Sequence, residues 1–219
     1  MFKKINFFHK CLCDPEYLSD DMHQFLQNPD AYFNKDNIIK NGDTSTVAKI
    51  QIDGHNLIVK RYNVKSFWHL INICWRKSRA IKSWHNAHRL QKLNIKTPNH
   101  IAILEKRFVL LHGKTYFITE FIQGTLLRHF FENDTGNQKE IVKNKMLELI
   151  QSLHSQRITH GDMKATNFIL QDLQPIILDL DAMRFHHYNF FLKKRIKKDL
   201  TRFMKNWKGN PEIEKLWMT

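Results

Sequence analysis

Carboxylate and amide side chains that could take part in phosphoryl transfer lie in two short stretches near the middle of the second half of the chain. The first stretch, His160–Asn167, contains Asp162, and the second, Ile177–Asp181, contains Asp179. Phosphoryl transfer needs a carboxylate that accepts or orients the acceptor hydroxyl, and oxygen ligands that hold Mg²⁺ against the phosphates of ATP. The spacing therefore predicts Asp162 as the base and Asn167 and Asp179 as metal ligands, with ATP and Mg²⁺ as the cofactors.

The first stretch resembles the catalytic loop of the protein-kinase-like superfamily. H-x-D-x-x-x-x-N is complete from His160 to Asn167, and Asp179 stands where D-F-G has its Asp. The string His160-Gly161-Asp162 is closer to the small-molecule kinases of that superfamily. Lys164 is similar to the catalytic-loop lysine of protein kinases, and this resemblance implies a catalytic role for it. The alternative is a surface loop whose Asp and Asn only form turns.

Upstream, Lys60 follows the predicted strand Leu57–Val59 and resembles the lysine of V-A-I-K, which binds nucleotide phosphates. Taken alone, Lys60 is better interpreted as one more basic residue on an edge strand, but its place after a hairpin favours the kinase role. Protein kinases pair this lysine with a helix glutamate, yet Gly54–Leu104 contains no Asp or Glu, and Asn86 stands near the expected place. Either Asp179 is the main partner of Lys60, or the enzyme is slow or inactive.

The segment Asn41–Val47 resembles a degenerate glycine-rich loop, in which only Gly42 and Val47 fit the pattern. Hydroxyl and backbone N–H groups of Ser45 and Thr46 are expected to bind phosphate oxygens. The residues expected to bind the nucleotide, including two from a stretch similar to the adenine-binding hinge, are Gly42, Ser45, Thr46, Val47, Lys60, Glu120 and Ile122.

The elements that position these residues follow from alternating and helical spacing of apolar residues. Strands are predicted at 46–52 and 57–60 around an Asp-Gly turn, and at 101–111, 115–122, 168–170 and 176–178. Helices are predicted at 75–93, 126–131, 140–153 and 191–207, and residues 1–35 are expected to form a short helical lead-in. This order predicts an α+β, protein-kinase-like fold with two lobes: a small antiparallel β N-lobe with one helix over 36–123, and a reduced, mainly helical C-lobe over 124–219.

Composition adds a strongly basic surface. The 219 residues contain 35 Lys and Arg against 21 Asp and Glu, a formal charge of +14, and 42% are hydrophobic, which excludes general disorder and indicates an anionic partner. The excess lies in two blocks, Gly54–Leu104 and Arg184–Lys208. No stretch reads as a signal peptide, the longest apolar run, Phe67–Trp75, is too short to span a membrane, and the three cysteines are expected to be reduced thiols. A cytoplasmic location is therefore expected.

Two features near the C-terminus each leave two interpretations open. Phe185, Tyr188, Phe190 and Phe191 precede the basic run Lys193–Lys198 and form either an interfacial membrane anchor or part of the packing of the small C-lobe. Likewise, Asp199 either braces the catalytic loop from below, as a helix aspartate does in related kinases, or is an ordinary exposed acid among lysines.

Several local strings are closer to one branch of the superfamily. They are Ser45-Thr46-Val47-Ala48, Val59-Lys60-Arg61-Tyr62-Asn63, Ser78-Arg79-Ala80 leading to Ser83-Trp84-His85-Asn86-Ala87, Lys96-Thr97-Pro98, Lys164-Ala165-Thr166-Asn167-Phe168 and Leu178-Asp179-Leu180-Asp181-Ala182-Met183-Arg184. They resemble the bacterial lipopolysaccharide kinase family. This resemblance implies an ATP-dependent sugar kinase that phosphorylates heptose or 3-deoxy-D-manno-octulosonic acid (Kdo) of the inner core, an anionic glycolipid acceptor, and a peripheral location at the inner face of the cytoplasmic membrane.

Two other functions remain as alternatives. Lys164 would suit a protein Ser/Thr kinase, although the chain after Asp181 lacks A-P-E and an activation segment of useful length. The missing helix glutamate would suit a pseudokinase or a basic binding module on the same fold, but nucleic-acid binding is not expected because no helix-turn-helix, zinc-finger or RNP-like signature is present. The acceptor hydroxyl and the oligomeric state are left open.

Overall fold

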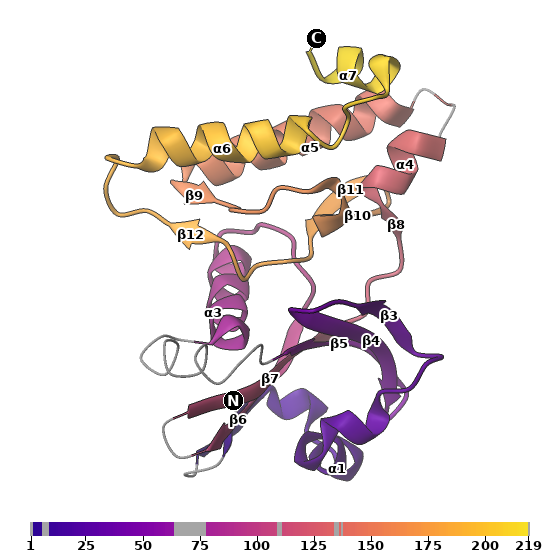
Figure 1. The fold of residues 1–219 in the computed structure, drawn as a ribbon, viewed down its shortest axis with the longest axis vertical. Coiled ribbons are helices and arrows are strands. Elements are labelled where there is room, and N and C mark those ends of the chain that lie inside the picture. Colours follow the sequence, from indigo (N-terminus) through magenta and orange to yellow (C-terminus); the bar gives the residue numbers. More distant parts are fainter. Residues whose placement is uncertain are drawn as a thin grey trace. The chain divides into compact units, whose positions relative to one another are not determined.

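The computed structural model describes residues 2–5, 9–63, 78–108, 111–133, 136 and 138–218 (Figure 1). They form two compact units, an N-terminal unit of Met1–His88 and Pro98–Phe121 and a C-terminal unit of Arg89–Thr97 and Ile122–Thr219. The apolar run Phe67–Trp75, with Cys74, lies outside the described residues, as do residues 75–77 of the predicted helix.

A seven-stranded antiparallel sheet dominates the N-terminal unit. Its strands are β1 (Phe2–Ile5), β2 (His9–Cys13), β3 (Ile38–Asn41), β4 (Ser45–Ile52), β5 (His55–Tyr62), β6 (His100–Phe108) and β7 (Leu111–Glu120). Their order across the sheet is β1-β2-β6-β7-β5-β4-β3, and each neighbouring pair is antiparallel. The predicted antiparallel β structure of this lobe is confirmed.

The β4–β5 hairpin carries Lys60 and follows the sequence pattern closely. Asp53 and Gly54 at its turn have φ of 48° and 75°, and two positive φ angles define the type I′ turn that Asp-Gly favours. Ala48, Ile50 and Ile52 of β4 are buried, and the residues between them are partly or fully exposed. Because side chains alternate between the two faces of a strand, Val47 lies on the face opposite this buried row. Lys60 pairs with Val47 across the hairpin and therefore lies on that opposite face too.

Helix α1 (Asp20–Gln27) covers the apolar face of the sheet. Its N-terminus is capped by Ser19, whose Oγ accepts from the backbone N–H of Met22 at 3.2 Å, and Met22, Phe25 and Leu26 are buried at helical spacing. The helix is flanked by the 3₁₀ turns η1 (Pro15–Tyr17) and η2 (Pro29–Tyr32). These side chains share one core with β4, β5, β6 and β7.

The expectation that residues 1–35 form only a helical lead-in is wrong in one respect. Strands β1 and β2 also lie there, and β2 pairs with β6 in register from His9–Lys106 to Cys13–Ala102. Cys11, Leu12 and Cys13 are all buried. Strand β2 is held in the sheet by hydrogen bonds to β6, which is distant in the sequence. The alternation of apolar and polar residues within so short a segment cannot reveal such a partner. Burial raises the pKa of the Cys13 thiol to about 12, in keeping with an unreactive thiol.

The C-terminal unit contains two small antiparallel sheets and four helices in its described part. Its elements are β8 (Thr125–Leu126), α4 (Leu127–Asn133), α5 (Gln138–Ser155), β9 (Ile158–Thr159), η3 (Ala165–Asn167), β10 (Phe168–Gln171), β11 (Gln174–Ile177), β12 (Arg184–Phe185), α6 (Leu192–Met204) and α7 (Pro211–Met218). The sheets have the strand orders β11-β10-β8 and β12-β9. None of the helices in the described parts of the chain combines the length and the apolar character that a membrane crossing requires.

Helices α5 and α6 lie side by side against β9, which leads into the His160–Asn167 loop (Figure 1). Helix α5 buries Val142, Met146, Ile150 and Leu153, which recur at nearly helical spacing. Helix α6 buries one polar residue, Asp199, and His154 Nε2 of α5 lies 3.9 Å from its Oδ2. The two helices therefore meet at a buried carboxylate.

Helix α7 was not predicted from the sequence. Asn210 Oδ1 accepts from the N–H of Ile213 at 3.3 Å, and Pro211 occupies the first turn, an arrangement that starts helices readily. Trp217 stacks on Trp207 at 5.6 Å between ring centroids, with the rings inclined by 14°. The Asn-Pro pair was the available signal, but the tail was too short to show helical periodicity.

Candidate active site

The loop that carries the predicted base starts directly after β9 and is fixed by Asp199. The backbone N–H of His160 donates to Asp199 Oδ2 at 2.6 Å, and the N–H of Gly161 donates to Oδ1 at 2.9 Å. Asp199 is 2% exposed, so its carboxylate makes these bonds away from water, where charge-assisted bonds are strong. The interpretation of Asp199 as a brace beneath the loop is therefore confirmed.

The side chain of His160 adds a second internal contact. It is fully buried, and burial lowers its pKa below the usual value, although the carboxylates of Asp199, Asp179 and Asp162 act in the opposite direction. Its Nδ1 accepts from the N–H of Asp162 at 3.4 Å, which places the proton of the neutral ring on Nε2. His160, the first residue of the loop, therefore helps to hold the backbone of Asp162 in place.

Gly161 cannot carry a side chain in this loop. Its φ is +82°, and an added Cβ would lie 2.5 Å from the carbonyl oxygen of Ala182, well inside van der Waals contact. This close approach joins the loop to the segment that follows Asp181. It explains in physical terms why Gly separates His160 from Asp162 here.

We expect Gly161→Ala to lower the free energy of unfolding by about 2–4 kcal/mol and to displace Asp162, because a positive φ costs about 1 kcal/mol for alanine and the clash with Ala182 adds to it. Chemical denaturation with turnover measurements checks this. Gly209→Ala is the matched control, because Gly209 also has a positive φ, +91°, but open space around its Cβ position. Equal losses in both variants would show that the contact with Ala182 is unimportant.

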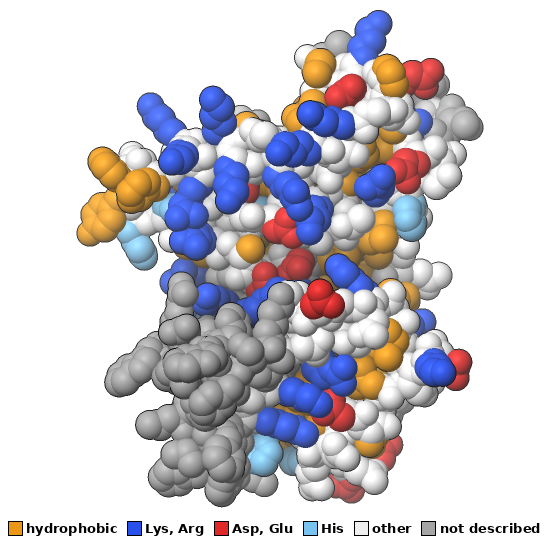
Figure 2. All heavy atoms as spheres, in the orientation of Figure 1, with side chains coloured by type: hydrophobic (Ala, Val, Ile, Leu, Met, Phe, Trp, Pro, Cys, Tyr) orange, Lys and Arg blue, Asp and Glu red, His pale blue; other side chains and the backbone are white. Residues whose placement is uncertain are grey.

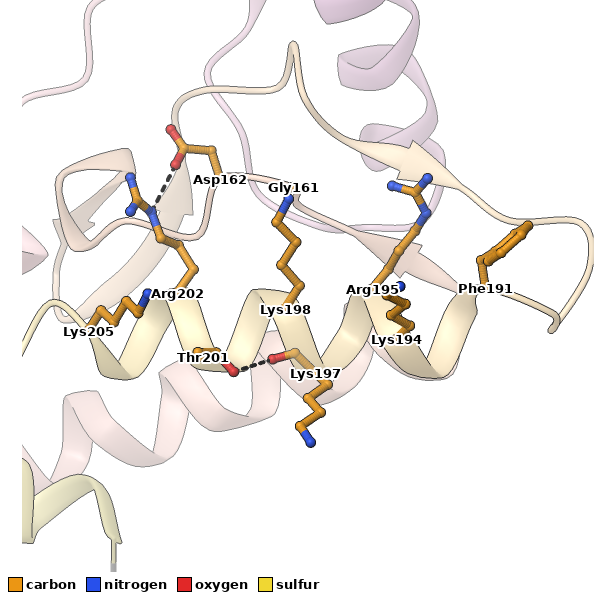
Figure 3. Close-up of a pocket in the computed structure, with 10 residues that line it drawn as sticks. All are labelled: Gly161, Asp162, Phe191, Lys194, Arg195, Lys197, Lys198, Thr201, Arg202 and Lys205. Atoms are coloured by element: carbon orange, nitrogen blue, oxygen red, sulfur yellow. Dashed lines mark hydrogen bonds and ion pairs between the residues drawn. The ribbon is translucent and has the colours of Figure 1, made fainter.

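Asp162 lies between two cations. Arg202 Nε is 3.3 Å from its Oδ1 (Figure 3), and Lys164 Nζ is 3.2 Å from its Oδ2. The Asp162 side chain remains 33% exposed. A carboxylate offers about four lone-pair directions, so these two contacts leave room for a hydroxyl donor. The structure therefore brings Asp162 and Lys164 together as the sequence predicts, and it adds Arg202.

Asn167 is oriented by Asp162. Its Nδ2 donates to the carbonyl oxygen of Asp162 at 2.8 Å and approaches Asp162 Oδ2 at 3.5 Å. A carbonyl can only accept, so the amide nitrogen must face Asp162, and Oδ1 points to the other side. Among the described residues, that Oδ1 has no hydrogen-bond partner, and it is therefore available as a ligand oxygen.

Asp179 is tied to the same loop through the backbone. The N–H of Leu178 donates to the carbonyl oxygen of Asn167 at 2.9 Å, and Asp179 Oδ1 accepts from the N–H of Asp181 at 3.5 Å. The β10–β11 hairpin between them turns at Asp172 and Leu173, which both have positive φ. The hairpin thus returns the chain from Asn167 to Asp179.

The described residues contain no group of three or more His, Cys, Asp or Glu side chains that could hold a metal ion alone. Mg²⁺ is usually held by one or two protein oxygens together with substrate phosphates and water. The hard oxygen donors of Asn167 and Asp179 fit this mode, whereas they would not suffice for a closed structural metal site.

Next to Asp162 lies a basic pocket of about 780 Å³, formed by the loop and one face of α6 (Figure 3). Its lining is Gly161, Asp162, Phe191, Lys194, Arg195, Lys197, Lys198, Thr201, Arg202 and Lys205. Lys198 and Arg202 extend toward the loop, whereas Lys197 points away from it. Asp162 is the single acid in this lining, so the pocket is suited to an anion.

Two residues near the loop, one on α6 and one just after its C-terminus, were missed in the sequence. Arg202 contacts Asp162, and Asn206 Nδ2 donates to the carbonyl oxygen of Met163 at 3.2 Å. Arg202 follows Asp199 by three residues, so that both lie on the same side of the helix. The spacing from Asp199 thus indicates the side of α6 on which Arg202 lies, but nothing local in the sequence reveals its contact with Asp162.

In the N-terminal unit, Lys60 lies on the sheet face that α3 (Arg79–Lys92) partly covers. Tyr62, which shares this face, contacts Ser83 of α3 through their hydroxyls at 3.1 Å, and Lys60 Nζ lies 5.2 Å from the Tyr62 ring centroid. Asn86, one turn beyond Ser83, is buried. The partner of Lys60 stays a prediction.

The Gly42–Thr46 turn departs from the expectation. Thr46 is fully buried, and its Oγ1 contacts Asn41 Oδ1 at 3.1 Å, Arg61 Nη2 at 3.2 Å and Asn63 Nδ2 at 3.4 Å. These contacts stabilise the hairpin, so the Thr46 hydroxyl is not free to bind phosphate, and that part of the expectation is wrong. By contrast, the Ser45 hydroxyl has no hydrogen-bond partner among the described residues.

Directly after β7, the backbone N–H of Ile122 is a candidate donor to a ligand. The N–H of Glu120 donates to Asn99 O at 2.9 Å and that of Phe121 donates to Asn56 O at 3.0 Å. In the described parts of the chain, no group accepts from the N–H of Ile122. A free N–H in this position is what an adenine-binding hinge requires.

Comparisons with known proteins place this site in a family. The family model described as "Lipopolysaccharide core biosynthesis protein (WaaY)" matches residues 14–209. KEOPS complex subunit Bud32 from Pyrococcus abyssi (strain GE5 / Orsay) is 23% identical over 128 residues, which are 58% of this chain and 53% of that protein. The chain thus spans about half the length of this curated relative.

A solved structure of WaaP in complex with acyl carrier protein matches with a TM-score of 0.62 and 13% sequence identity. The match covers 95% of this chain and 88% of the WaaP chain, and it shows that the two share a fold. The predicted α+β, protein-kinase-like fold is confirmed, and so is the resemblance to lipopolysaccharide kinases. Because the family match includes the whole segment from the Gly42 turn to the end of α6, the chain belongs to the lipopolysaccharide core biosynthesis protein (WaaY) family.

Proposed function

We propose that the protein is an ATP-dependent kinase that phosphorylates a sugar hydroxyl, on heptose or Kdo, of the lipopolysaccharide inner core. The observation that carries this proposal is the group formed by Asp162, Lys164 and Asn167 on one braced loop, with Asp179 joined to it by the Leu178–Asn167 hydrogen bond. These are the residue types that phosphoryl transfer uses, in a chain of a lipopolysaccharide core family.

In this proposal, Asp162 accepts or orients the proton of the acceptor hydroxyl. Its exposed carboxylate can reach a hydroxyl in the adjacent basic pocket. Lys164, 3.2 Å from Asp162, carries the positive charge that can neutralise the transferred phosphoryl oxygens. Asn167 Oδ1 and the Asp179 carboxylate hold Mg²⁺, which neutralises charge on the ATP phosphates when bound.

For ATP itself, we propose that Lys60 contacts the phosphates, and that Gly42, Ser45 and Val47 line the nucleotide on the hairpin face opposite the buried row Ala48, Ile50 and Ile52. Two observations support this: Lys60 pairs with Val47 across the hairpin, and the Ser45 hydroxyl has no hydrogen-bond partner among the described residues. We propose separately that the N–H of Ile122 donates to adenine. The carbonyl of Glu120 would accept from the adenine amino group.

The basic pocket supports an anionic acceptor. Six Lys or Arg side chains surround one carboxylate there, and such a concentration of charge raises the local concentration of an anion and its rate of association. Phosphate and carboxylate groups of an inner-core glycolipid have the required charge. We propose a cytoplasmic, peripheral membrane location for the same reason, since the acceptor is lipid-linked.

A phosphate-transfer assay tests this function. Purified protein, labelled ATP and Mg²⁺ are incubated with unphosphorylated inner-core lipopolysaccharide fragments and, in parallel, with a generic protein substrate. We expect labelled glycolipid and no labelled protein. Labelled protein with unlabelled glycolipid would favour a protein kinase, and nucleotide binding without transfer to either substrate would favour a pseudokinase.

A further inference from the structure

Three aromatic side chains project from the short loop between β12 and α6. Tyr188 and Phe190 are 84% and 85% exposed and Phe191 is 58% exposed, whereas Phe185, at the start of this segment, packs beneath Arg89 with 4.7 Å between the guanidinium carbon and the ring centroid. The interpretation that all four aromatics pack the C-lobe is therefore wrong for three of them. Six other large apolar side chains are exposed in the described chain, and none adjoins another in sequence.

The loop that carries these rings is anchored at its start to the β9 segment and closes with a turn at the beginning of α6. At its start, the N–H of His186 donates to Arg157 O at 2.9 Å, and His186 Nε2 lies 2.8 Å from Thr159 Oγ1. At its end, the N–H of Leu192 donates to Asn189 O at 3.1 Å. Phe190 and Phe191 also contact each other edge to face at 4.7 Å. The fold therefore presents the rings to solvent on a fixed support.

The helix that follows the rings supplies a purely basic surface. Lys193, Lys194, Arg195, Lys197 and Lys198 lie in its first two turns. Its single acid, Asp199, is buried and directed at the His160–Gly161 backbone, so it does not offset these charges at the surface. Figure 2 shows the exposed hydrophobic group beside a row of Lys and Arg side chains in the C-terminal unit.

Protruding aromatic rings next to lysines match the chemistry of a lipid–water interface. Aromatic rings prefer the headgroup region, and each Lys or Arg near an anionic leaflet strengthens binding by about fivefold. A folded protein partner would be expected to meet a groove or a flat patch, whereas these rings stand out from the surface with most of their area free. Single-stranded nucleic acid is the competing ligand, because its bases stack on aromatic rings and its phosphates bind basic side chains.

We propose that Tyr188, Phe190 and Phe191 insert into the headgroup region of an anionic phospholipid leaflet, with the basic first turns of α6 facing the lipid phosphates. Phe191 also lines the pocket beside Asp162, so the inserted loop is one edge of the acceptor site. A lipid-linked sugar would then enter that pocket from the leaflet. Insertion of the rings into the leaflet does not depend on the proposed function. Entry of the lipid-linked sugar into the pocket does rest on the proposed function.

Vesicle sedimentation of the full chain without ATP tests the docking. We expect the protein to bind vesicles of phosphatidylcholine with phosphatidylglycerol at least about tenfold more strongly than vesicles of phosphatidylcholine alone, and to be released when salt rises from about 0.1 M toward 1 M. Tyr188→Ser with Phe190→Ser should weaken binding to the anionic vesicles by about tenfold or more. Neither residue lines the pocket beside Asp162.

Ile141→Ser with Leu147→Ser on α5 is the matched control, because it removes two exposed apolar side chains elsewhere in the same unit. It should bind vesicles as the unaltered protein does. Unchanged vesicle binding of the Tyr188/Phe190 variant, equal loss in the control, or release from vesicles by single-stranded nucleic acid at equal phosphate concentration would each overturn the proposal.

A second readout separates this proposal from the kinase proposal. With a soluble, acyl-free core oligosaccharide, the Tyr188/Phe190 variant should turn over as fast as the unaltered protein. With the same core on intact lipid in anionic vesicles, its turnover should fall by about tenfold. Vesicle binding without turnover on either acceptor would contradict the kinase function alone, and full turnover without vesicle binding would contradict the docking alone.

Discussion

Replacing Asp162 with Asn should lower the rate of phosphate transfer by about 10³-fold while leaving nucleotide binding and the fold unchanged. General acid–base catalysis by one positioned group contributes about 10²–10⁴-fold, and an amide of the same shape cannot accept the hydroxyl proton. The fold should tolerate the change because the side chain is 33% exposed and its contacts with Lys164 and Arg202 are exposed ion pairs, which contribute little to stability. Single-turnover transfer with saturating ATP measures the effect.

Asp172→Asn is the matched control for this substitution. Asp172 is exposed in the β10–β11 turn with φ of 51°, a backbone conformation that Asn adopts readily. It removes one negative charge from the same unit and should leave transfer unchanged. Transfer by the Asp162 variant within about threefold of the unaltered rate would exclude Asp162 as the base.

Replacing Asp199 with Asn should lower the free energy of unfolding by about 3 kcal/mol and should also abolish most activity. Two backbone N–H groups donate to the two oxygens of this buried carboxylate, and an Asn side chain can accept only one of them. Its amide nitrogen would face the other N–H, which leaves a buried donor without a partner, and hydrogen bonds to charged groups contribute about 1.5–3 kcal/mol each. Urea denaturation measures the loss of stability.

The reduction in activity should exceed what partial unfolding accounts for, because the loop that carries Asp162 loses its anchor. Glu148→Gln on the exposed face of α5 removes a charge at the surface and should change stability by less than about 0.5 kcal/mol. If Asp199→Asn unfolded at the same urea concentration as the unaltered protein, the brace beneath the loop would be energetically unimportant.

The sequence predicted the hairpins around the candidate catalytic loop well because the signals for them are local. Turn signals and short apolar runs defined the β4–β5 and β10–β11 hairpins, and these hairpins place Lys60 in a strand and Asp179 beside Asn167. Both hairpins depend on few residues that are close in the chain. The brace at Asp199 joins residues 39 positions apart, and it could be proposed only from the resemblance to related kinases, beside the alternative of an ordinary exposed acid.

Features that depend on distant partners could not be predicted. Arg202 contacts Asp162 across 40 positions, and β2 finds its place only by pairing with β6. The Thr46 hydroxyl was assigned to phosphate because its type fits, yet Arg61 and Asn63 from the adjacent strand engage it. In each case the competing partner is provided by the tertiary fold, and residue type alone cannot reveal it.

The basic character of the chain is likewise clearer in three dimensions. Most Lys and Arg side chains of the block Arg184–Lys208 lie on α6, and six basic side chains of this helix and its C-terminal flank surround the pocket beside Asp162. Much of the other block, Gly54–Leu104, belongs to the N-terminal unit, and residues 64–77 of it lie outside the described chain. The charge near the proposed base is therefore concentrated on one helix face.

The central claim is that Asp162 directs a phosphoryl group from ATP to a sugar hydroxyl of the inner core. Phosphorus NMR of purified, unphosphorylated core oligosaccharide after incubation with the protein, ATP and Mg²⁺ tests it most directly. We expect a new phosphate monoester signal coupled to a sugar proton, present with the unaltered protein and with Asp172→Asn and absent with Asp162→Asn. ATP binding without any sugar monoester, or an equal monoester signal from the Asp162→Asn protein, would contradict it.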